Sequence, residues 1–304
     1  MWTESPLLRD VGAALLTAVV AAAVLRFWEV VANRELLDQV SFSLASSVIS
    51  PFPIREFLLF WCELVLRSQL KSKKMVHITV GFAYFLMWPL FSSDDVYAPF
   101  LAPLIIELNI VKVTLIGLGI VKDEGVVNSM TRHGDRRELL KGPLYYACAV
   151  TLTTIIFWRT SPISIAVLCN LFAGDGVADI VGRRLGHAKL PHNNDKSYAG
   201  SIAMFIAGFI ASALLMCYFH HFGFVEQSWR MVLAFGVISF VAAVVESLPI
   251  STRLDDNLTV TLASALVGAL VFHFIGVRNL CCMNSDGSNI SAIVQMVFAG
   301  SSSK

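Results

Sequence analysis

The chain has 304 residues, of which 56% are hydrophobic and only 15% are charged, and its formal net charge at pH 7 is +1. Such a balance gives no overall attraction to nucleic acid, which argues against nucleic-acid binding as its function. The sequence contains repeated apolar runs of the length, about 17 to 25 residues, that a helix needs to cross a bilayer. We therefore predict an all-α fold, a polytopic transmembrane helical bundle that has the lipid bilayer as a partner.

Residues 1–70 are predicted to hold one span, over residues 11–31, and an apolar segment at 57–66. That segment is short, so it either lies at the membrane interface or forms a span completed by its flanks. Later runs predict seven more spans, over residues 75–91, 98–121, 143–158, 162–181, 199–219, 231–250 and 258–277. Since short runs can be re-entrant, the expected total is seven to nine membrane helices. We expect residues 71–279 to form one membrane domain and residues 280–304 a loosely ordered tail.

Basic residues gather in three loops, at residues 67–74, 122–141 and 183–196. Each loop is separated from the next by two predicted spans, so all three lie on one face of the membrane. A further two spans bring the acidic segment 255–256 to the same face. The excess of Lys and Arg predicts that this face is cytosolic or stromal, where a nucleotide is available.

The segment 174–201, GDGVADIVGRRLGHAKLPHNNDKSYAGS, joins acids, glycines and cations at the end of an apolar span. Ionisable groups in such a position are functional by default, and we interpret the segment as part of the active site. Asp175 and Asp179 are four residues apart and share one face of a helix. A divalent cation would offset their repulsion, and Mg²⁺ favours one or two carboxylates together with substrate phosphates. Alternatively, the two acids only solvate a helix end.

Four glycines in this segment have two interpretations. Gly174 and Gly176 flank Asp175 and could allow a ligand close to the backbone. They could equally serve tight helix packing, as could Gly182 and Gly186, which have the spacing typical of close helix contacts.

The cations of the segment precede the start of the next span. Lys196 and Ser197 stand where that helix begins, and a helix N-terminus with nearby cations favours an anion such as phosphate. The alternative is that these side chains anchor the helices at the lipid headgroups. The cations concerned are Arg183, Arg184, Lys189 and Lys196.

A second polar cluster lies further along the chain. It comprises Glu246 late in one span and Asp255, Asp256 and Asn257 at the start of the next. One of these acids could simply cap the helix, but capping does not account for all four groups. Arg137 and Lys141, directly before the span at 143–158, could bind phosphate or fix the orientation of the helix. His77 in the span at 75–91 is a weaker candidate, because a lone His is usually a satisfied polar contact.

Several catalytic motifs are absent from the sequence. It contains no GxxxxGK[ST] phosphate loop, no protein-kinase HRD or DFG motif, no GxSxG elbow and no HExxH helix. Acids, cations and glycines at a membrane face remain. Such a set suits phosphoryl transfer, in which catalysis consists mostly of positioning and charge neutralisation.

In its polar segments described above, the chain resembles the polyprenol kinases, a family that includes dolichol kinase and the plant phytol and farnesol kinases. The resemblance covers most of the sequence from about residue 70 to residue 260, and its motifs are specific in combination. They are Lys73-Lys74-x-Val76-His77-Ile78, Arg137-Glu138-Leu-Leu-Lys141-Gly142-Pro143, Gly174-Asp175-Gly176-x-Ala178-Asp179-x-x-Gly182-Arg183, Lys196-Ser197 and Glu246-Ser-Leu-Pro followed by Asp255-Asp256-Asn257.

The resemblance implies a kinase that uses a nucleoside triphosphate, typically CTP, to phosphorylate an isoprenoid alcohol. For the plant enzymes the alcohol is phytol, farnesol or geranylgeraniol, the reaction belongs to isoprenoid salvage that can feed tocopherol synthesis, and the usual site is the chloroplast envelope. The first ten residues contain two acids and one Arg, unlike a typical transit peptide, so the endoplasmic reticulum is the alternative location.

On this hypothesis Asp175 or Asp179 binds the metal, and Asp255 or Asp256 is a second metal ligand or accepts the proton of the alcohol. Cations would stabilise charge on the phosphates; the candidates are Arg183, Lys196, Arg137 and Lys141. Two rival functions are weighed. The rival enzyme is a CDP-alcohol phosphotransferase or cytidylyltransferase; the phosphotransferase pattern needs an Arg step where this sequence runs from Ala178 into Asp179, and a second pair of acids on a spacing that this sequence does not have. A transporter would place polar residues at mid-span rather than at one face.

Overall fold

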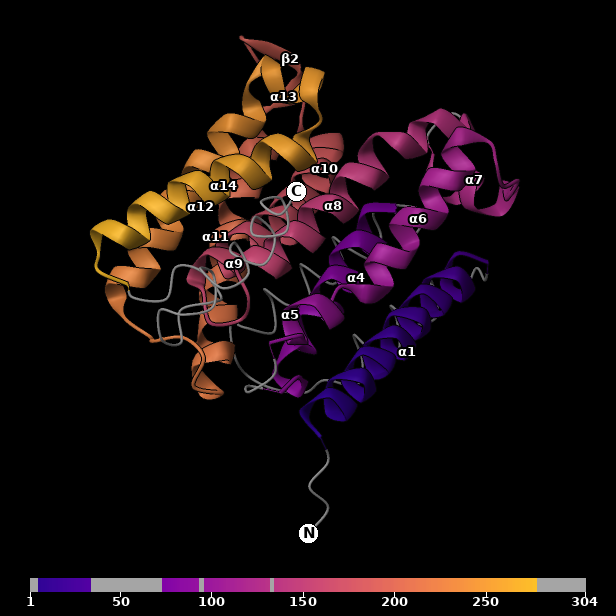
Figure 1. Cartoon of the computed structure of the whole chain (residues 1–304). Coiled ribbons are helices and arrows are strands. Elements are labelled where there is room, and N and C mark those ends of the chain that lie inside the picture. Colours follow the sequence, from indigo (N-terminus) through magenta and orange to yellow (C-terminus); the bar gives the residue numbers. More distant parts are fainter. Residues whose placement is uncertain (1–4, 34–72, 93–95, 132–133, 278–304) are drawn as a thin grey trace, which may run out of the picture.

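The computed structural model describes residues 5–33, 73–92, 96–131 and 134–277. The apolar segment predicted at 57–66 and the tail predicted at 280–304 lie outside these residues, so both stay predictions. The described part is helical apart from one two-stranded antiparallel hairpin (Figure 1). The predicted all-α class is thereby confirmed.

The elements follow one another along the chain in this order: α1 (Pro6–Asn33), α4 (Lys73–Leu86), the 3-10 helix η1 (Trp88–Leu90), α5 (Ala98–Leu101), α6 (Leu104–Leu118), α7 (Glu124–Met130), the 3-10 helix η2 (Arg136–Leu140), α8 (Gly142–Ile156), α9 (Pro162–Cys169), the π-helix η3 (Asn170–Gly174), α10 (Asp175–Leu185), β1 (Lys189–Leu190), β2 (Asn193–Ser197), α11 (Tyr198–His221), α12 (Trp229–Ser247), α13 (Pro249–Leu254) and α14 (Asp256–Phe274).

Six helical segments in the described residues are long and apolar enough to cross a membrane, and a shorter apolar helix covers His77–Leu90. The six are Pro6–Phe27, Arg136–Ile156, Pro162–Leu185, Tyr198–His221, Trp229–Ser247 and Asp256–Phe274. The polytopic membrane bundle expected from the apolar runs is therefore confirmed.

Local sequence sets where these helices begin. Four helices begin with a residue whose side-chain oxygen accepts a hydrogen bond from a backbone N–H of the first turn. These residues are Ser161 for α9, Ser197 for α11, Ser228 for α12 and Asp255 for α14. These caps satisfy N–H groups that have no partner within the helix.

The predicted span at 98–121 is wrong as one continuous helix. The structure divides it into α5, which ends at Leu101, and α6, which begins at Leu104 after Pro103. Proline lacks the N–H needed to continue the hydrogen-bond ladder, which explains the break. α6 then ends at Gly119, whose φ of 81° is the left-handed conformation that glycine adopts without strain.

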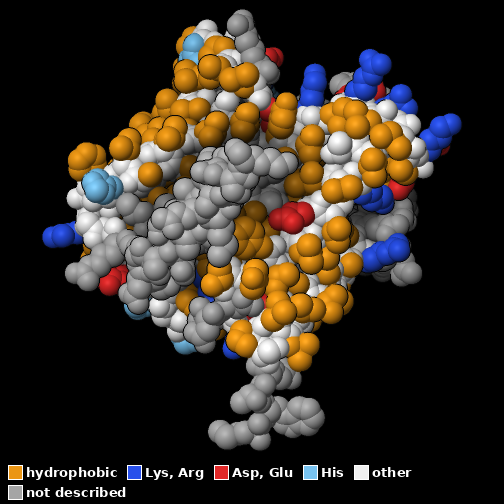
Figure 2. Space-filling model, in the orientation of Figure 1, with side chains coloured by type: hydrophobic (Ala, Val, Ile, Leu, Met, Phe, Trp, Pro, Cys, Tyr) orange, Lys and Arg blue, Asp and Glu red, His pale blue; other side chains and the backbone are white. Residues whose placement is uncertain are grey.

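The span Pro162–Leu185 is the centre around which the bundle packs. Every residue of α9 is buried, and 83% of the apolar window of this span is buried, against 22% for α1. By contrast, α11 and α14 expose apolar side chains at every fourth position, the face that a lipid-facing helix presents: Ile202, Ile206, Ile210 and Leu214 on α11, and Leu258, Leu262, Leu266 and Leu270 on α14. Figure 2 shows apolar side chains spread over the visible side of the bundle, with Lys and Arg gathered toward the end where α7 lies.

At the opposite end of the bundle, a buried arginine ties three segments together. The guanidinium of Arg159 donates to the carbonyl oxygens of Trp88 at 2.9 Å, Phe91 at 2.7 Å and Ser92 at 2.6 Å. Asp10 of α1 accepts hydrogen bonds from the backbone N–H and hydroxyl of Ser92. Burial lowers the pKa of Arg159 to about 10, an effect that the charge of Asp10 partly opposes, so the side chain remains a cation at neutral pH.

Candidate active site

A cavity of about 660 Å³ opens at one end of the bundle. Six parts of the fold converge there: the start of α8, the helix α10, the hairpin, the start of α11, the end of α12 and the start of α14. Three of the polar segments that loop counting assigned to one face, those ending at Lys141 and Lys196 and the acidic segment 255–256, do meet there. The loop predicted at 67–74 lies mostly outside the described residues, and none of its described residues lines the cavity. The lining of the cavity comprises Glu138, Lys141, Gly142, Pro143, Asp175, Ala178, Asp179, Gly182, Arg183, Lys189, Asp195, Lys196, Ser197, Gly200, Ser201, Glu246, Asp255 and Asp256.

Carboxylates outnumber cations around this cavity. The lining holds seven acids and four bases: Glu138, Asp175, Asp179, Asp195, Glu246, Asp255 and Asp256 against Lys141, Arg183, Lys189 and Lys196. A polyanionic ligand such as a nucleoside triphosphate would therefore meet net repulsion unless cations accompany it.

Asp175 and Asp179 line the cavity from one face of α10, as their spacing predicts. Asp175 is buried at the start of that helix. Asp179 Oδ1 accepts a hydrogen bond from Nε of Arg183 at 3.0 Å and forms an ion pair with Nη2 of the same side chain, also at 3.0 Å. Asp179 Oδ2 is buried and has no hydrogen-bond partner within the described residues. An unpaired buried carboxylate oxygen is costly, which is the condition a bound cation relieves.

The glycines beside these acids contact neighbouring helices and do not line the cavity. A Cβ atom on Gly174 would lie 3.3 Å from Met204 of α11, and one on Gly176 would lie 2.4 Å from Ile78 of α4. The packing interpretation therefore describes the contacts of both glycines, while their role in admitting a ligand stays a prediction. Gly182 lies against Gly200, where α10 crosses α11, and both of these glycines border the cavity.

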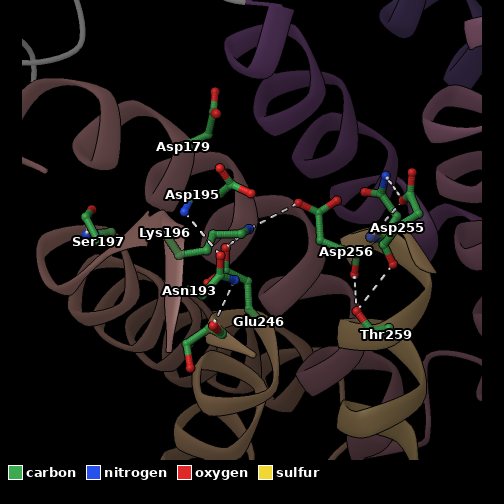
Figure 3. A network of polar contacts seen from close by, with 12 residues as sticks. Asp179, Asn193, Asp195, Lys196, Ser197, Glu246, Asp255, Asp256 and Thr259 are labelled. Atoms are coloured by element: carbon green, nitrogen blue, oxygen red, sulfur yellow. Dashed lines mark hydrogen bonds and ion pairs between the residues drawn. The ribbon is translucent and has the colours of Figure 1, made fainter. Parts of the chain in front are cut away.

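Lys196 reaches across the cavity wall from β2 to two acids, as Figure 3 shows. Its ammonium contacts Glu246 Oε1 and lies 3.5 Å from Asp256 Oδ2. Burial of Lys196 opposes its charge, but Glu246, Asp256 and Asp175 together raise its pKa above the ordinary value of 10.5. The cation predicted to bind phosphate is thus already paired with carboxylates.

Asp255 occupies a strained backbone position. Its φ of 77° makes it the only residue other than glycine with positive φ in the described part of the chain. Its Oδ1 accepts from the backbone N–H of Asn257 at 3.0 Å and from Nδ2 of the same residue at 2.9 Å. Asp255 therefore does cap α14, yet its carboxyl group also lines the cavity. Strain of this kind persists where the surrounding structure enforces it, and often at functional sites.

The hairpin of β1 and β2 forms one wall of the cavity. Its strands pair Leu190 with Asn193 across a two-residue turn, and Asn193 Nδ2 donates to the carbonyl of Ser247 at 3.1 Å. The hairpin brings Lys189 and Asp195 to the lining. Sequence reasoning missed this hairpin; the proline and asparagines of Pro191-His-Asn-Asn194 are the turn signal that could have found it.

Ten of the candidate residues meet at the cavity: Lys141, Asp175, Asp179, Arg183, Lys189, Lys196, Ser197, Glu246, Asp255 and Asp256. Asn257 does not line the cavity but donates a hydrogen bond to Asp255, which does. The hydroxyl of Ser197 caps α11 by accepting from the backbone N–H of Gly200. Arg137 is exposed and does not line the cavity, nor does His77, whose ring packs 4.6 Å from that of Tyr146. Glu138 and Asp195 line it without having been predicted as site residues.

Curated relatives cover most of the chain. It is 53% identical over 268 residues to a probable phytol kinase 2, chloroplastic, of Oryza sativa subsp. japonica, spanning 88% of this chain and 78% of that protein. It is 49% identical over 272 residues to a farnesol kinase, chloroplastic, of Arabidopsis thaliana, spanning 90% of this chain and 78% of that protein. The phytol kinase 1, chloroplastic, of the same plant is 42% identical over 68% of each chain.

No family model and no solved structure match the chain. The relatives are named chloroplastic, and six helices in the described part of the chain are long and apolar enough to cross a membrane, which together confirm the predicted multi-pass plastid membrane protein. Identity near one half is sustained over about nine-tenths of the sequence. The chain therefore belongs to the polyprenol kinase family, in the branch of the phytol and farnesol kinases.

Proposed function

We propose that this kinase transfers the terminal phosphoryl group of CTP to phytol, or to farnesol or geranylgeraniol, in isoprenoid salvage that feeds tocopherol synthesis. The observation that carries the proposal is the cavity, where acids and cations from five separate segments converge at one end of an apolar bundle. An isoprenoid tail would lie along the apolar helices in lipid, while its hydroxyl enters the polar cavity.

In the proposed reaction the alcohol oxygen forms a bond to the terminal phosphorus of the nucleotide. The bond from that phosphorus to the bridging oxygen breaks, and the hydroxyl proton passes to a carboxylate, for which Asp255 is the better placed of two candidates. Asp256 is 3.5 Å from the ammonium of Lys196 and is already engaged in that ion pair. The products are an isoprenoid monophosphate and a nucleoside diphosphate.

The residues of α10 fit a magnesium ion. The buried, unpartnered Oδ2 of Asp179 is a hard oxygen donor beside Asp175, and the carboxylate excess of the cavity favours a divalent cation. Among the described residues no three His, Cys, Asp or Glu side chains are grouped to hold a metal alone. That matches Mg²⁺, which takes one or two carboxylates and completes its shell with phosphates and water. When bound, Mg²⁺ would neutralise charge on the transferred phosphoryl group.

The cations of the cavity have separate roles in this proposal. Lys141, just before α8, and Arg183 of α10 line the cavity and would contact the phosphates directly. Lys196 instead keeps Glu246 and Asp256 neutralised and in place. Arg137, which is exposed outside the lining, would steer the incoming anion without touching it.

The test is an assay of membranes from a heterologous host with phytol, farnesol and geranylgeraniol, each with CTP and with ATP. We expect a monophosphate of the alcohol and CDP, and no product in membranes without the chain. Release of CMP, with the alcohol joined through a phosphodiester, would instead identify a CDP-alcohol phosphotransferase. Retention of full activity in both Asp175→Asn and Asp255→Asn would refute the assigned site.

A further inference from the structure

A π-helical turn precedes the two acids of α10. In η3 the backbone N–H of Asp175 donates to the carbonyl of Asn170, five residues earlier. A π turn contains one residue more than an α turn, which rotates everything after it by about 100° relative to α9. The direction in which Asp175 and Asp179 point therefore depends on this turn.

The side chain of Asn170 fixes one side of the turn. Asn170 is fully buried in the middle of the bundle, and its Nδ2 donates to the hydroxyl of Ser264 on α14 at 3.2 Å. Its Oδ1 has no hydrogen-bond partner in the described residues and lies against Gly208 of α11. A Cβ atom on Gly208 would be 2.1 Å from that oxygen, so only glycine leaves room for the amide.

The other side of the turn rests on α4. There the ring of Phe172 lies over Gly81, where a Cβ atom would be 2.6 Å from the ring. The helices α11 and α4 thus pack against the π turn from two sides, each through a glycine, Gly208 and Gly81. An amide oxygen left without a partner in an apolar interior is unfavourable, so helix packing alone does not explain why Asn170 is there.

We propose that Asn170 is a positioning residue: seated on Gly208 and bonded to Ser264, it holds the π turn in register and so aims Asp175 and Asp179 into the cavity. The inference rests on the proposed function in one respect, because it takes these two acids to be the metal-binding residues of the kinase. The geometry of the turn itself does not depend on which reaction the chain catalyses.

The first experiment compares Gly208→Ala with Gly268→Ala. Both are buried glycines of membrane helices, but a Cβ atom on Gly268 makes only ordinary contact, 3.5 Å from Ile163. We expect Gly208→Ala to lower kcat at least about tenfold, because the new methyl group displaces Asn170 and a misplacement of about 1 Å at catalytic groups can cost about 100-fold. The control should stay within about twofold of the wild type.

Combining Gly208→Ala with Asn170→Ala tests the fit directly. Asn170→Ala removes the oxygen that the new methyl group strikes, so the double variant should have the activity of Asn170→Ala alone, not the product of the two losses. If the double variant is as impaired as that product, or if Gly208→Ala is fully active, the proposal is wrong.

The second experiment measures the direction of α10 without using catalysis. Asp179→Cys places a thiol on the cavity lining. The rate at which a water-soluble maleimide modifies this thiol is compared between Asp179→Cys alone and the same chain with a second substitution. We expect Asn170→Ala and Gly208→Ala each to change that rate at least about threefold, and Gly268→Ala to leave it unchanged.

A variant that only loosens the fold would lower thermal stability without a specific change in the labelling rate of this thiol. Should Gly208→Ala fail to fold, Asn170→Ala alone decides, and an unaltered labelling rate in that variant overturns the proposal. If the wild type phosphorylates no isoprenoid alcohol, the proposed function fails, whereas the labelling rates still report on the turn.

Discussion

The carboxylate of Asp179 has its two oxygens in different environments, one paired with Arg183 and the other buried without a partner among the described residues. We predict that Asp179→Asn lowers kcat at least about 100-fold, because an amide is a poor ligand for a magnesium ion that neutralises phosphoryl charge. Initial rates over a range of Mg²⁺ concentrations measure the effect. Asp135→Asn is the control, since Asp135 is an exposed cap of η2 outside the cavity. Equal rates in the two variants would remove Asp179 from the site.

Lys196 and Glu246 form a pair in which the acid is almost fully buried. Lys196→Met should lower the free energy of unfolding by about 3 kcal/mol, because it leaves the charge of Glu246 poorly compensated. Adding Glu246→Gln should restore most of that loss, and chemical unfolding in detergent measures both. A double variant no more stable than Lys196→Met would show that the pair is not coupled.

The pH dependence of this pair has a definite sign. Because the folded protein raises the pKa of Lys196 above 10.5, the pairing contributes stability below that pH and loses it only as the pH rises through the raised value. The stability difference between wild type and Lys196→Met should therefore be constant from about pH 7 to pH 9. A steady decline across that range would contradict the assigned pairing.

Asp255 combines a cap with backbone strain. Asparagine tolerates positive φ and retains a capping oxygen, so Asp255→Asn should fold with a melting temperature within about 3 °C of the wild type. Its kcat should fall at least about 100-fold, because the amide cannot accept the proton of the alcohol. Calorimetry and the kinase assay on one preparation separate the two effects, and normal activity would mean that Asp255 only caps the helix.

Among the elements, the segment between α8 and α9 carries the arginine that joins α1 and η1 to the bundle. Arg159→Met should reduce the free energy of unfolding by about 3 kcal/mol, since three carbonyl oxygens and Asp10 lose their cation. KM for the nucleotide should be unaffected, because Arg159 does not line the cavity. Arg230→Met, an exposed cation at the start of α12, is the matched control for thermal unfolding.

Elements defined by periodicity were predictable, and those defined by tertiary fit were not. Apolar runs gave the positions of α8, α11, α12 and α14 to within a few residues, because span length is dictated by the bilayer. Pro103 marked the break before α6, yet the apolar character of the run concealed it. The π turn depends on the contact of Asn170 with Gly208, residues far apart in sequence, so no local pattern indicates it.

At the scale of the whole molecule, two loops lie on the same face of the membrane when an even number of spans separates them. Counting spans predicted that the loops around Lys141, Lys196 and Asp255 would meet, and they do. It did not predict that Lys196 would pair with Glu246, because side-chain direction depends on where the hairpin folds over the end of α12.

This topology can be tested by labelling in sealed membranes. We expect a cysteine at exposed Asn194, in the hairpin, and one at exposed Glu226, between α11 and α12, to react from opposite sides of the membrane. The side that labels Asn194→Cys should also be the side from which the nucleotide is consumed. Labelling of both positions from one side would contradict the arrangement of α11 as a span.

The excess of carboxylates in the cavity has a consequence for how the enzyme would be controlled in its membrane. A nucleotide without its cations is repelled by a wall that holds seven acids and four bases, so the rate would follow the amount of metal-complexed nucleotide rather than total nucleotide. The cavity would thereby couple alcohol phosphorylation to the supply of the divalent cation that accompanies the nucleotide.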